Sequence, residues 1–207
     1  MTIRKGQEWG SLTVAAAAMA TVSSNAELRA MVEAARKNGS DITTVGLLGG
    51  DLMRTLGGSA QVSRFTSGEP VPHLPIDLVH VVADGSRESW FAAHLVARHT
   101  WWRGQIVAAM NAQFINMWDV APRCHPNDGL VDLVTANATM NLQQRWLARS
   151  RLRLGTHVPH PLITTRQSAT ASLDLPGKTP LWLDGQRWGS ARHVQITVEP
   201  DAFVVVV

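Results

Sequence analysis

Four short segments of the sequence combine residue types that could do chemistry. The first, residues 46–57, places Gly49 and Gly50 directly before Asp51 and Arg54. Paired glycines free the backbone for a tight turn, and the N–H groups that begin a following helix can bind a phosphate. The segment therefore predicts a phosphate site at these residues; the alternative is a strand–Gly–Gly–helix junction that serves only as a tight connection.

The second segment, residues 120–132, contains two prolines and an Asn-Asp-Gly turn, which together fix the shape of a loop. Asp128 and Asp132 supply carboxylate oxygens of the kind that Mg²⁺ prefers. Two carboxylates alone make a poor site, so backbone carbonyl groups and water would have to complete the coordination. The alternative is a hairpin turn in which Asp128 serves only the turn.

The remaining two segments each allow two interpretations. Residues 155–161 carry His157 and His160 three positions apart, but no nearby cysteine or acidic residue completes a zinc site. Residues 184–186 follow a predicted strand as an Asp-Gly turn. Asp184 can act there as a general base, or it can serve only to reverse the chain.

The first 60 residues predict the elements that would position the glycine-rich segment. Residues 12–22 are small and apolar and predict a buried strand, and residues 23–25 supply helix N-cap side chains. Residues 26–37 carry apolar side chains on one face and predict an amphipathic helix. Residues 43–48 form a second apolar run before the paired glycines. The order β-α-β-α is typical of a parallel α/β layer.

The chain becomes β-rich after a connection expected at residues 57–75, where glycines and prolines occur without periodicity. A hairpin is predicted from residues 76–82 and 89–96, which flank an Asp-Gly turn. Further strands are predicted at residues 105–117, 130–135, 194–199 and 203–207, with a turn at residues 200–201. These patterns indicate a β-sandwich built from hairpins.

One helical stretch, residues 140–154, interrupts the β-rich part and contains four arginines beside leucine and tryptophan. A basic amphipathic helix can lie on an anionic membrane, whereas an ordinary surface helix can present the same arginines to water. Nucleic acid is not expected as a partner, because no base-reading motif accompanies the arginines.

The composition permits a well-packed core, because 45% of the residues are hydrophobic and 17% are charged. The formal charge of +3 is only weak support for an anionic partner. A single cysteine, Cys124, precludes a disulfide within the chain and suits a reducing compartment. The apolar stretch near the N-terminus is far shorter than a membrane span. We therefore expect a cytoplasmic protein, peripheral at the membrane if it meets one.

Taken in order, the four segments resemble the diacylglycerol-kinase-like family of lipid kinases. In that family a pattern similar to residues 50–57 ends the nucleotide-binding part, and a DGLLDV loop similar to residues 127–132 lies in the β-sandwich that follows. A Gly-x-His stretch and an Asp-Gly-Glu turn come next, similar to residues 155–157 and 184–186. The resemblance covers residues 40–207 in the family's order and spacing.

Several family features are missing from this chain. The N-terminal βαβ region and its NP-x-SG motif have no counterpart, and no glycine stands at residues 22–25, where the phosphate-binding GGDGT loop is expected. Gly50 replaces an asparagine of the family's turn. Gln186 replaces the glutamate that the resemblance implies as catalytic base, and glutamine cannot accept a proton.

The resemblance implies binding of ATP with Mg²⁺ and transfer of the γ-phosphate to a lipid hydroxyl. It assigns the catalytic turn to Asp184 and Gln186, the nucleotide side to Gly49, Gly50, Asp51 and Arg54, and Mg²⁺ to Asp128 with the carbonyl groups of His125 and Leu130. It also implies contact with a lipid or a membrane surface.

Two hypotheses follow from the resemblance and from its departures. The chain is either a lipid kinase that phosphorylates a lipid alcohol, or a catalytically impaired relative that binds a lipid, a phosphorylated ligand or a protein. The expected fold is α+β, with a shortened α/β nucleotide-domain remnant over residues 1–60 and a β-sandwich over residues 61–207. An incomplete first sheet leaves an open edge, so we also expect a homodimer or a partner that completes it.

Overall fold

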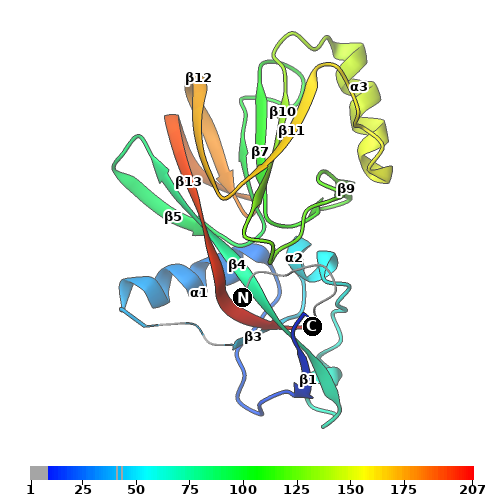
Figure 1. Cartoon of the computed structure of the whole chain (residues 1–207), viewed down its shortest axis with the longest axis vertical. Coiled ribbons are helices and arrows are strands. Elements are labelled where there is room, and N and C mark those ends of the chain that lie inside the picture. Colours follow the sequence, from blue (N-terminus) through cyan, green and yellow to red (C-terminus); the bar gives the residue numbers. More distant parts are fainter. Residues whose placement is uncertain (1–8, 41, 43) are drawn as a thin grey trace.

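The computed structural model describes residues 9–40, 42 and 44–207 (Figure 1). The helices are α1 (Asn25–Lys37), α2 (Gly50–Thr55) and α3 (Leu142–Arg151), with short 3-10 turns η1 (Val62–Phe65) and η2 (Leu152–Leu154). The strands are β1 (Ser11–Val14), β2 (Thr21–Val22), β3 (Thr44–Leu47), β4 (Pro70–Ala83), β5 (Arg87–Phe91), β6 (His94–Ala97), β7 (Ile106–Met110), β8 (Phe114–Ile115), β9 (Trp118–Asp119), β10 (Val131–Ala136), β11 (Ile163–Ser168), β12 (Thr170–Leu183) and β13 (Gln186–Val206).

Eleven of the described strands belong to one sheet, whose main path runs β1-β4-β13-β12-β6-β7-β10-β11. Antiparallel hairpins build most of it, because β4 pairs with β5 and β12 pairs with β13. Apolar side chains from β4, β5, β6, β7, β10, β12 and β13 form one core inside the curved sheet. This arrangement confirms the α+β class with a large β-sandwich-like part.

The N-terminal part forms the predicted β-α-β-α layer. Strand β2 pairs in parallel with β3, and the end of β13 pairs in parallel with the other edge of β3. Helix α1 begins after Ser24, whose side chain accepts a hydrogen bond from the amide of Glu27. The sequence predicts this N-cap, because serine and asparagine residues directly precede the helix. Helices α1 and α2 pack their apolar faces with these strands in a second core.

The expectation of one buried strand over residues 12–22 is wrong. Strand β1 is exposed along its length and pairs with the beginning of β4, whereas β2 contains only two residues. Alanines fill much of the segment between these strands. Alanine has no branched side chain to pack on a pleated surface, so the apolar composition did not amount to strand propensity.

Further boundaries differ from the sequence-based expectation: the strand predicted over residues 89–96 is divided between β5 and β6, and that over residues 105–117 between β7 and β8. Strand β4 begins at Pro70, inside the segment predicted as a connection, and its proline carbonyl groups still accept hydrogen bonds from the amide of Val207 and the indole of Trp9. The expected turn at residues 200–201 is a local irregularity inside β13, where Asp201 has φ of 50°. Aspartate tolerates this left-handed conformation, so the strand is interrupted without reversing.

Helix α3 confirms the predicted helical stretch and lies at the end of the molecule farthest from α1 and α2 (Figure 1). Asn141 and Gln144 form a capping box at its start, and Gly155 ends η2 with φ of 64°. Within the described parts of the chain, no helix is long and apolar enough to cross a membrane.

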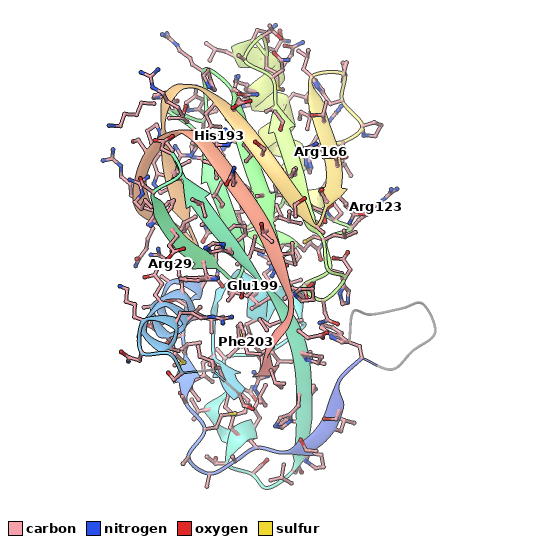
Figure 2. All side chains as sticks on the ribbon, turned by 60° about the vertical axis from the view of Figure 1, so that its left-hand side comes forward. Arg29, Arg123, Arg166, His193, Glu199 and Phe203 are labelled. Carbon is pink, nitrogen blue, oxygen red and sulfur yellow. The ribbon has the colours of Figure 1, made fainter. Side chains whose placement is uncertain are left out.

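The boundary near residue 60 stays a prediction. Strands β4 and β13 run from the β-rich part into the N-terminal layer. Phe203 of β13 lies in the second core, here called the lower core, and the core inside the curved sheet is called the upper core (Figure 2). Both layers are therefore built on the same two long strands.

Candidate functional site

The starts of helices α1 and α2 meet, and the buried side chain of Asn25 joins them. Its Oδ1 accepts a hydrogen bond of 3.3 Å from the amide of Leu52, and its Nδ2 donates to Oδ2 of Asp51 at 3.1 Å. Asn25 therefore satisfies one of the backbone N–H groups that a helix start leaves free.

The paired glycines allow this close approach of the two helix starts. Gly50 has φ of +93°, and a Cβ there would lie 2.3 Å from Oδ1 of Asn25. A Cβ at Gly49 would lie 2.2 Å from the carbonyl oxygen of Ser23. Both contacts are far too short for any other residue type. Asn25 therefore occupies one backbone donor at the turn to which the resemblance assigns a phosphate, and the nucleotide-binding role of this turn stays a prediction.

Asp51 and Asp184 are brought together through His94. Nε2 of His94 lies 2.9 Å from Oδ2 of Asp51, and the amide of His94 donates to Oδ1 of Asp184 at 3.1 Å. Oδ1 of Asp51 accepts from the amide of Asn116 at 2.7 Å. His94 is 2% exposed, and its Nδ1 has no hydrogen-bond partner among the residues that the structure describes.

The carboxylate of Asp184 is occupied by backbone donors. It accepts hydrogen bonds from the amides of Ala92, Ala93 and His94 at 2.9 to 3.1 Å. Burial raises the pKa of Asp184, and the neighbouring His94 with these hydrogen bonds opposes that rise. The carboxylate thus fixes the bend between β5 and β6. A general base must reach the proton of its substrate, and the role of Asp184 as a base stays a prediction.

Gln186 lies against α1. Its Oε1 accepts a hydrogen bond of 3.1 Å from Arg29, which also lies 3.4 Å from Oε1 of Glu33. Ser89 donates to the same Glu33 oxygen. Arg29 sits at the junction of helix and sheet (Figure 2), and its Nε is buried with no partner within the described chain. Gln186 therefore serves here as a neutral acceptor for a buried cation.

Arg54 holds a small hairpin against α2. Its guanidinium donates to the carbonyl oxygen of Asn116 and stacks over Phe114, with 4.1 Å between the guanidinium carbon and the ring centroid. The hairpin of β8 and β9 is therefore fixed beside Asp51, which binds the amide of the same Asn116. Arg54 and Asp51 both contact Asn116, and their nucleotide-binding role stays a prediction.

The loop of residues 125–130 is clamped by Asp77, a fully buried residue of β4 that the sequence analysis did not single out. Asp77 accepts hydrogen bonds from the amides of Gly129 at 2.7 Å and Asp201 at 3.0 Å. Its own amide donates to the carbonyl oxygen of Pro126 at 2.7 Å. The sequence did contain a signal for Asp77, because a carboxylate within a largely apolar strand requires hydrogen-bond partners.

Asp128 is the carboxylate of this loop that fits a cation best. Burial, together with the nearby carboxylates of Asp132 and Asp77, raises its pKa to about 6. A cation would relieve this crowding of negative charge, and Mg²⁺ in proteins commonly keeps several waters and binds through one or two carboxylates. Oδ1 of the neighbouring Asn127 is buried and has no hydrogen-bond partner among the described residues.

A metal ion fits this loop only if it binds through Asp128 and keeps most of its waters. Across residues 9–40, 42 and 44–207, no three His, Cys, Asp or Glu side chains gather in a way that could hold a metal ion. A site at Asp128 would therefore depend on backbone carbonyl groups, such as those of His125 and Leu130, and on water.

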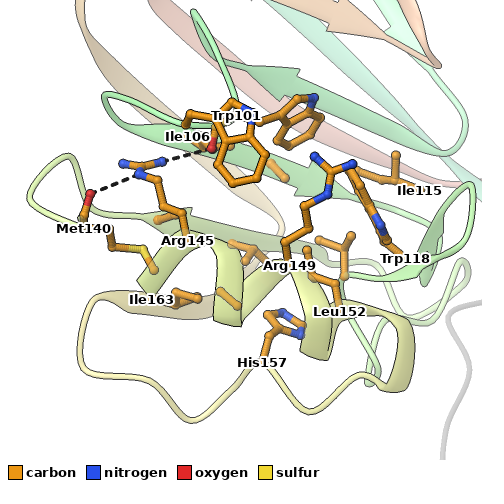
Figure 3. A pocket seen from close by; sticks show the side chains of 16 residues that line it. Trp101, Ile106, Ile115, Trp118, Met140, Arg145, Arg149, Leu152, His157 and Ile163 are labelled. Atoms are coloured by element: carbon orange, nitrogen blue, oxygen red, sulfur yellow. Dashed lines mark hydrogen bonds between the residues drawn. The ribbon is translucent and has the colours of Figure 1, made fainter. Parts of the chain in front are cut away.

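An apolar cavity of about 100 Å³ lies between α3 and the sheet at the far end of the molecule (Figure 3). Its walls are mostly tryptophan, aliphatic and alanine side chains, and they include Trp101, Ile106, Ala108, Ile115, Trp118, Val134, Met140, Ala148, Leu152 and Ile163. Such a cavity suits a hydrocarbon segment, because cavities with apolar walls stay dry and bind apolar molecules. The helix was predicted from the sequence, but no sequence pattern indicated a cavity beneath it.

Arg145 and His157 are the buried polar residues at this cavity. Arg145 donates to the carbonyl oxygens of Met140, Trp101, Gly104 and Asn137, which attaches α3 to two loops. His157 is 3% exposed, and burial lowers its pKa. Neither of its ring nitrogens makes a hydrogen bond of normal geometry within the described part of the chain. His157 can therefore offer a donor or an acceptor to a ligand.

Comparison with known proteins identifies one matching family model. The model of the YegS C-terminal NAD kinase beta sandwich-like domain matches residues 77–207. No curated protein is similar enough to count as a match.

Solved structures give a consistent likeness of fold. A diacylglycerol kinase from Bacillus anthracis strain Sterne is 14% identical, with a TM-score of 0.54 over 79% of this chain and 66% of that chain. Two structures from the same organism, provisionally described as diacylglycerol kinases, are 11% and 13% identical with TM-scores of 0.59 and 0.57. They cover 79% of this chain and 69% and 68% of theirs. This chain thus spans about two thirds of the length of these structures.

Proposed function

Because this chain belongs to the family of the YegS C-terminal NAD kinase beta sandwich-like domain, we propose that it is a lipid-binding member with impaired phosphoryl transfer. Its ligand is a lipid alcohol, of which one hydrocarbon segment occupies the cavity beneath α3. The proposal corresponds to the second of the two hypotheses that the sequence leaves open.

The contrast between the two ends of the molecule carries this proposal. At the start of α2, the amide of Leu52 and both carboxylate oxygens of Asp51 already have protein partners. Gln186 cannot accept a proton and is bonded to Arg29. At the far end, the cavity beneath α3 is open and apolar. Lipid binding therefore has a cavity available, whereas a nucleotide would have to compete with these protein partners at the start of α2.

The polar part of the ligand has a candidate partner in His157. The backbone of Val120 is the polar group beside this buried imidazole, and a lipid hydroxyl or ester carbonyl would supply the hydrogen bond that the other ring nitrogen lacks. Arg145 does not compete for this role, because its donors are bound to backbone carbonyl groups.

We propose a structural role for Mg²⁺ in the loop of residues 125–130. Asp128 would hold the ion together with the carbonyl groups of His125 and Leu130, and the ion would supply positive charge against the crowded carboxylates. Added Mg²⁺ should then raise the thermal unfolding temperature of the wild-type chain and leave that of Asp128→Asn unchanged. An equal rise in both proteins would exclude Asp128 as a ligand.

Direct binding measurements test the main proposal. The purified chain should bind a fluorescent monoacylglycerol, kept below its critical micelle concentration, in the absence of nucleotide. Ala148→Phe places a ring in the cavity and should weaken this binding by about tenfold or more, equivalent to about 1.4 kcal/mol. The matched control is Ser150→Phe, which adds the same ring to an exposed position of the same helix.

The nucleotide arm of the experiment uses the same preparations. ATP with Mg²⁺ should stabilise the chain no more than Mg²⁺ alone, and no labelled phosphate should reach diacylglycerol. Loss of lipid binding in both α3 variants, or in neither, would contradict the cavity as the binding site. Phosphate transfer by the wild-type chain would contradict impaired catalysis.

Active phosphoryl transfer to a lipid hydroxyl is the second candidate function. One observation favours it: Asp51 and Asp184 are linked through His94, so the positions that the resemblance assigns to nucleotide and catalysis lie near each other. A catalytic base typically contributes about 10²–10⁴-fold to the rate. Gln186→Glu should then produce measurable transfer of labelled phosphate if the remaining site is competent, and none if it is not.

We also propose that the open edge of β2 is covered by a second copy of the chain or by another protein, because exposed edges pair readily. Light scattering distinguishes a homodimer from a monomer.

A further inference from the structure

The exposed side of α3 and η2 carries four large apolar side chains beside Gln143, Ser150 and three arginines. Trp146 is 63% exposed, Leu147 40% and Leu154 77%, and Leu142 at the helix start is 59% exposed. Trp102, in the adjacent loop between β6 and β7, is 39% exposed. These five residues, here called the α3 patch, are a majority of the nine exposed large apolar side chains in the described residues.

Folding does not require the α3 patch, because α3 uses a different face for packing. Arg145 and Ala148 of α3 and Leu152 of η2 point toward the cavity and the sheet (Figure 3). The four members of the α3 patch on α3 and η2 therefore leave apolar surface in water, whereas Trp102 also lines the cavity.

The charge around the α3 patch has one sign. No aspartate or glutamate occurs in residues 89–118 or in residues 133–173, which supply α3, the β6–β7 loop and β11. Exposed arginines flank the α3 patch at positions 103, 149, 151 and 153. The guanidinium of Arg149 also lies over Trp102 and Trp118, at 5.4 and 4.9 Å from their centroids. A basic border around exposed tryptophan and leucine matches the headgroup and acyl layers of an anionic bilayer.

We propose that the α3 patch docks the protein on an anionic membrane surface, with Trp146 and the leucines among the acyl chains and the arginines on the headgroups. A second copy of this chain is a poorer occupant, since a symmetric contact would place these arginines against their own copies. Each basic residue near such a surface strengthens binding by about fivefold at low salt. Docking here places the cavity beneath α3 next to the lipid, and it does not depend on lipid binding in that cavity.

Vesicle sedimentation with the full chain tests this docking surface. The wild-type protein should bind vesicles of phosphatidylcholine with phosphatidylglycerol, should bind pure phosphatidylcholine vesicles at least about tenfold more weakly, and should dissociate in high salt. The double variant Trp146→Ser/Leu147→Ser should lose about tenfold or more on anionic vesicles. The variant Arg151→Glu/Arg153→Glu should lose binding and salt dependence together.

The matched control is Leu12→Ser/Val62→Ser, which removes two apolar side chains that are 70% and 55% exposed outside the α3 patch. It should bind vesicles as the wild type does. Unchanged binding of monomeric monoacylglycerol by Trp146→Ser/Leu147→Ser shows that the cavity is intact, so failure of docking is separable from failure of the proposed function. Equal binding to neutral and anionic vesicles, full binding by the double variant, or self-association through the α3 patch in place of vesicle binding would overturn the proposal.

Discussion

Buried carboxylates in this protein accept backbone hydrogen bonds. Asp184 accepts three amide hydrogen bonds at the bend between β5 and β6, and Asp77 accepts two that fix the loop of residues 125–130 and the irregularity in β13. Hydrogen bonds to a charged acceptor are stronger than those between neutral groups. These carboxylates therefore stabilise irregular backbone that lies beside the candidate site.

Asp128 leads to a prediction about the dependence of stability on pH. Burial and the neighbouring carboxylates raise its pKa from 3.8 to about 6. A raised carboxyl pKa means that the folded state holds the proton more tightly than the unfolded state, so stability falls as pH rises from about 4 to about 6. Asp128→Asn removes this loss. The variant should unfold like the wild type near pH 4 and be more stable by about 1–2 kcal/mol near pH 7, after allowance for partial exposure.

Urea unfolding at a series of pH values in a chelating buffer measures this difference. Asparagine can still accept the hydrogen bond that Oδ1 of Asp128 receives from the amide of Leu130, so the turn is kept. Glu69→Gln, at an exposed position, controls for the loss of one negative charge. A stability difference that does not change between pH 4 and pH 7 would show that the pKa of Asp128 is not raised in the folded state.

The sequence indicated candidate site residues but not the partners that hold them, and the functional roles of those residues stay predictions. Asp51, Arg54, Asp128 and Asp184 were named from local patterns, since turns and helix starts have recognisable residue preferences. Asn25, His94 and Asp77 were missed as partners because they come from other elements, and no short motif contains both members of these pairs. The contact of Asn25 with the start of α2 was therefore beyond prediction from sequence.

Elements were predictable where the local pattern alone decides them. Helix α1 and the helix of residues 140–154 carry caps and one-sided apolar patterns, and both were found. The run of residues 12–22 and the proline-rich beginning of β4 have no such pattern, and sheet pairing decides their structure. Tertiary pairing can override local propensity in strands, because strand preference mainly reflects packing with neighbours.

The attachment of helix α3 to the rest of the molecule depends on one buried side chain, Arg145. Arg145 bonds four carbonyl oxygens that lie in the loops on both sides of the cavity. Arg145→Met keeps a side chain of similar length and removes every donor. Unfolding free energy should fall by about 2–3 kcal/mol, in line with the contribution of hydrogen bonds to a charged group. Amide hydrogen exchange should accelerate most in residues 142–154.

The control is Arg151→Met, which makes the same change at an exposed position of α3. It should leave both unfolding and exchange within experimental error of the wild type. If Arg145→Met accelerates exchange equally in α1 and α3, the arginine stabilises the whole fold and does not attach α3 in particular.

The N-terminal layer and the β-rich part share their two longest strands, β4 and β13, so the stability of one part depends on the other. The lower core contains Leu52 from the first 60 residues together with Ile76 of β4 and Val205 of β13. The upper core contains Val81 and Val194 of the same two strands. Neither layer can lose β4 and β13 and keep its core, so the two parts should unfold together.

Calorimetry should therefore show one unfolding transition, with equal calorimetric and van't Hoff enthalpies. Leu52→Ala and Leu181→Ala make the same change in the lower and upper cores, at positions 1% and 0% exposed. Each should cost about 2–5 kcal/mol and lower the single Tm by about 5–15 °C. Independent domains meeting near residue 60 would instead give two transitions, of which Leu52→Ala would shift one and Leu181→Ala the other. One shared transition would mean that residues 61–207 depend on the N-terminal layer for their stability.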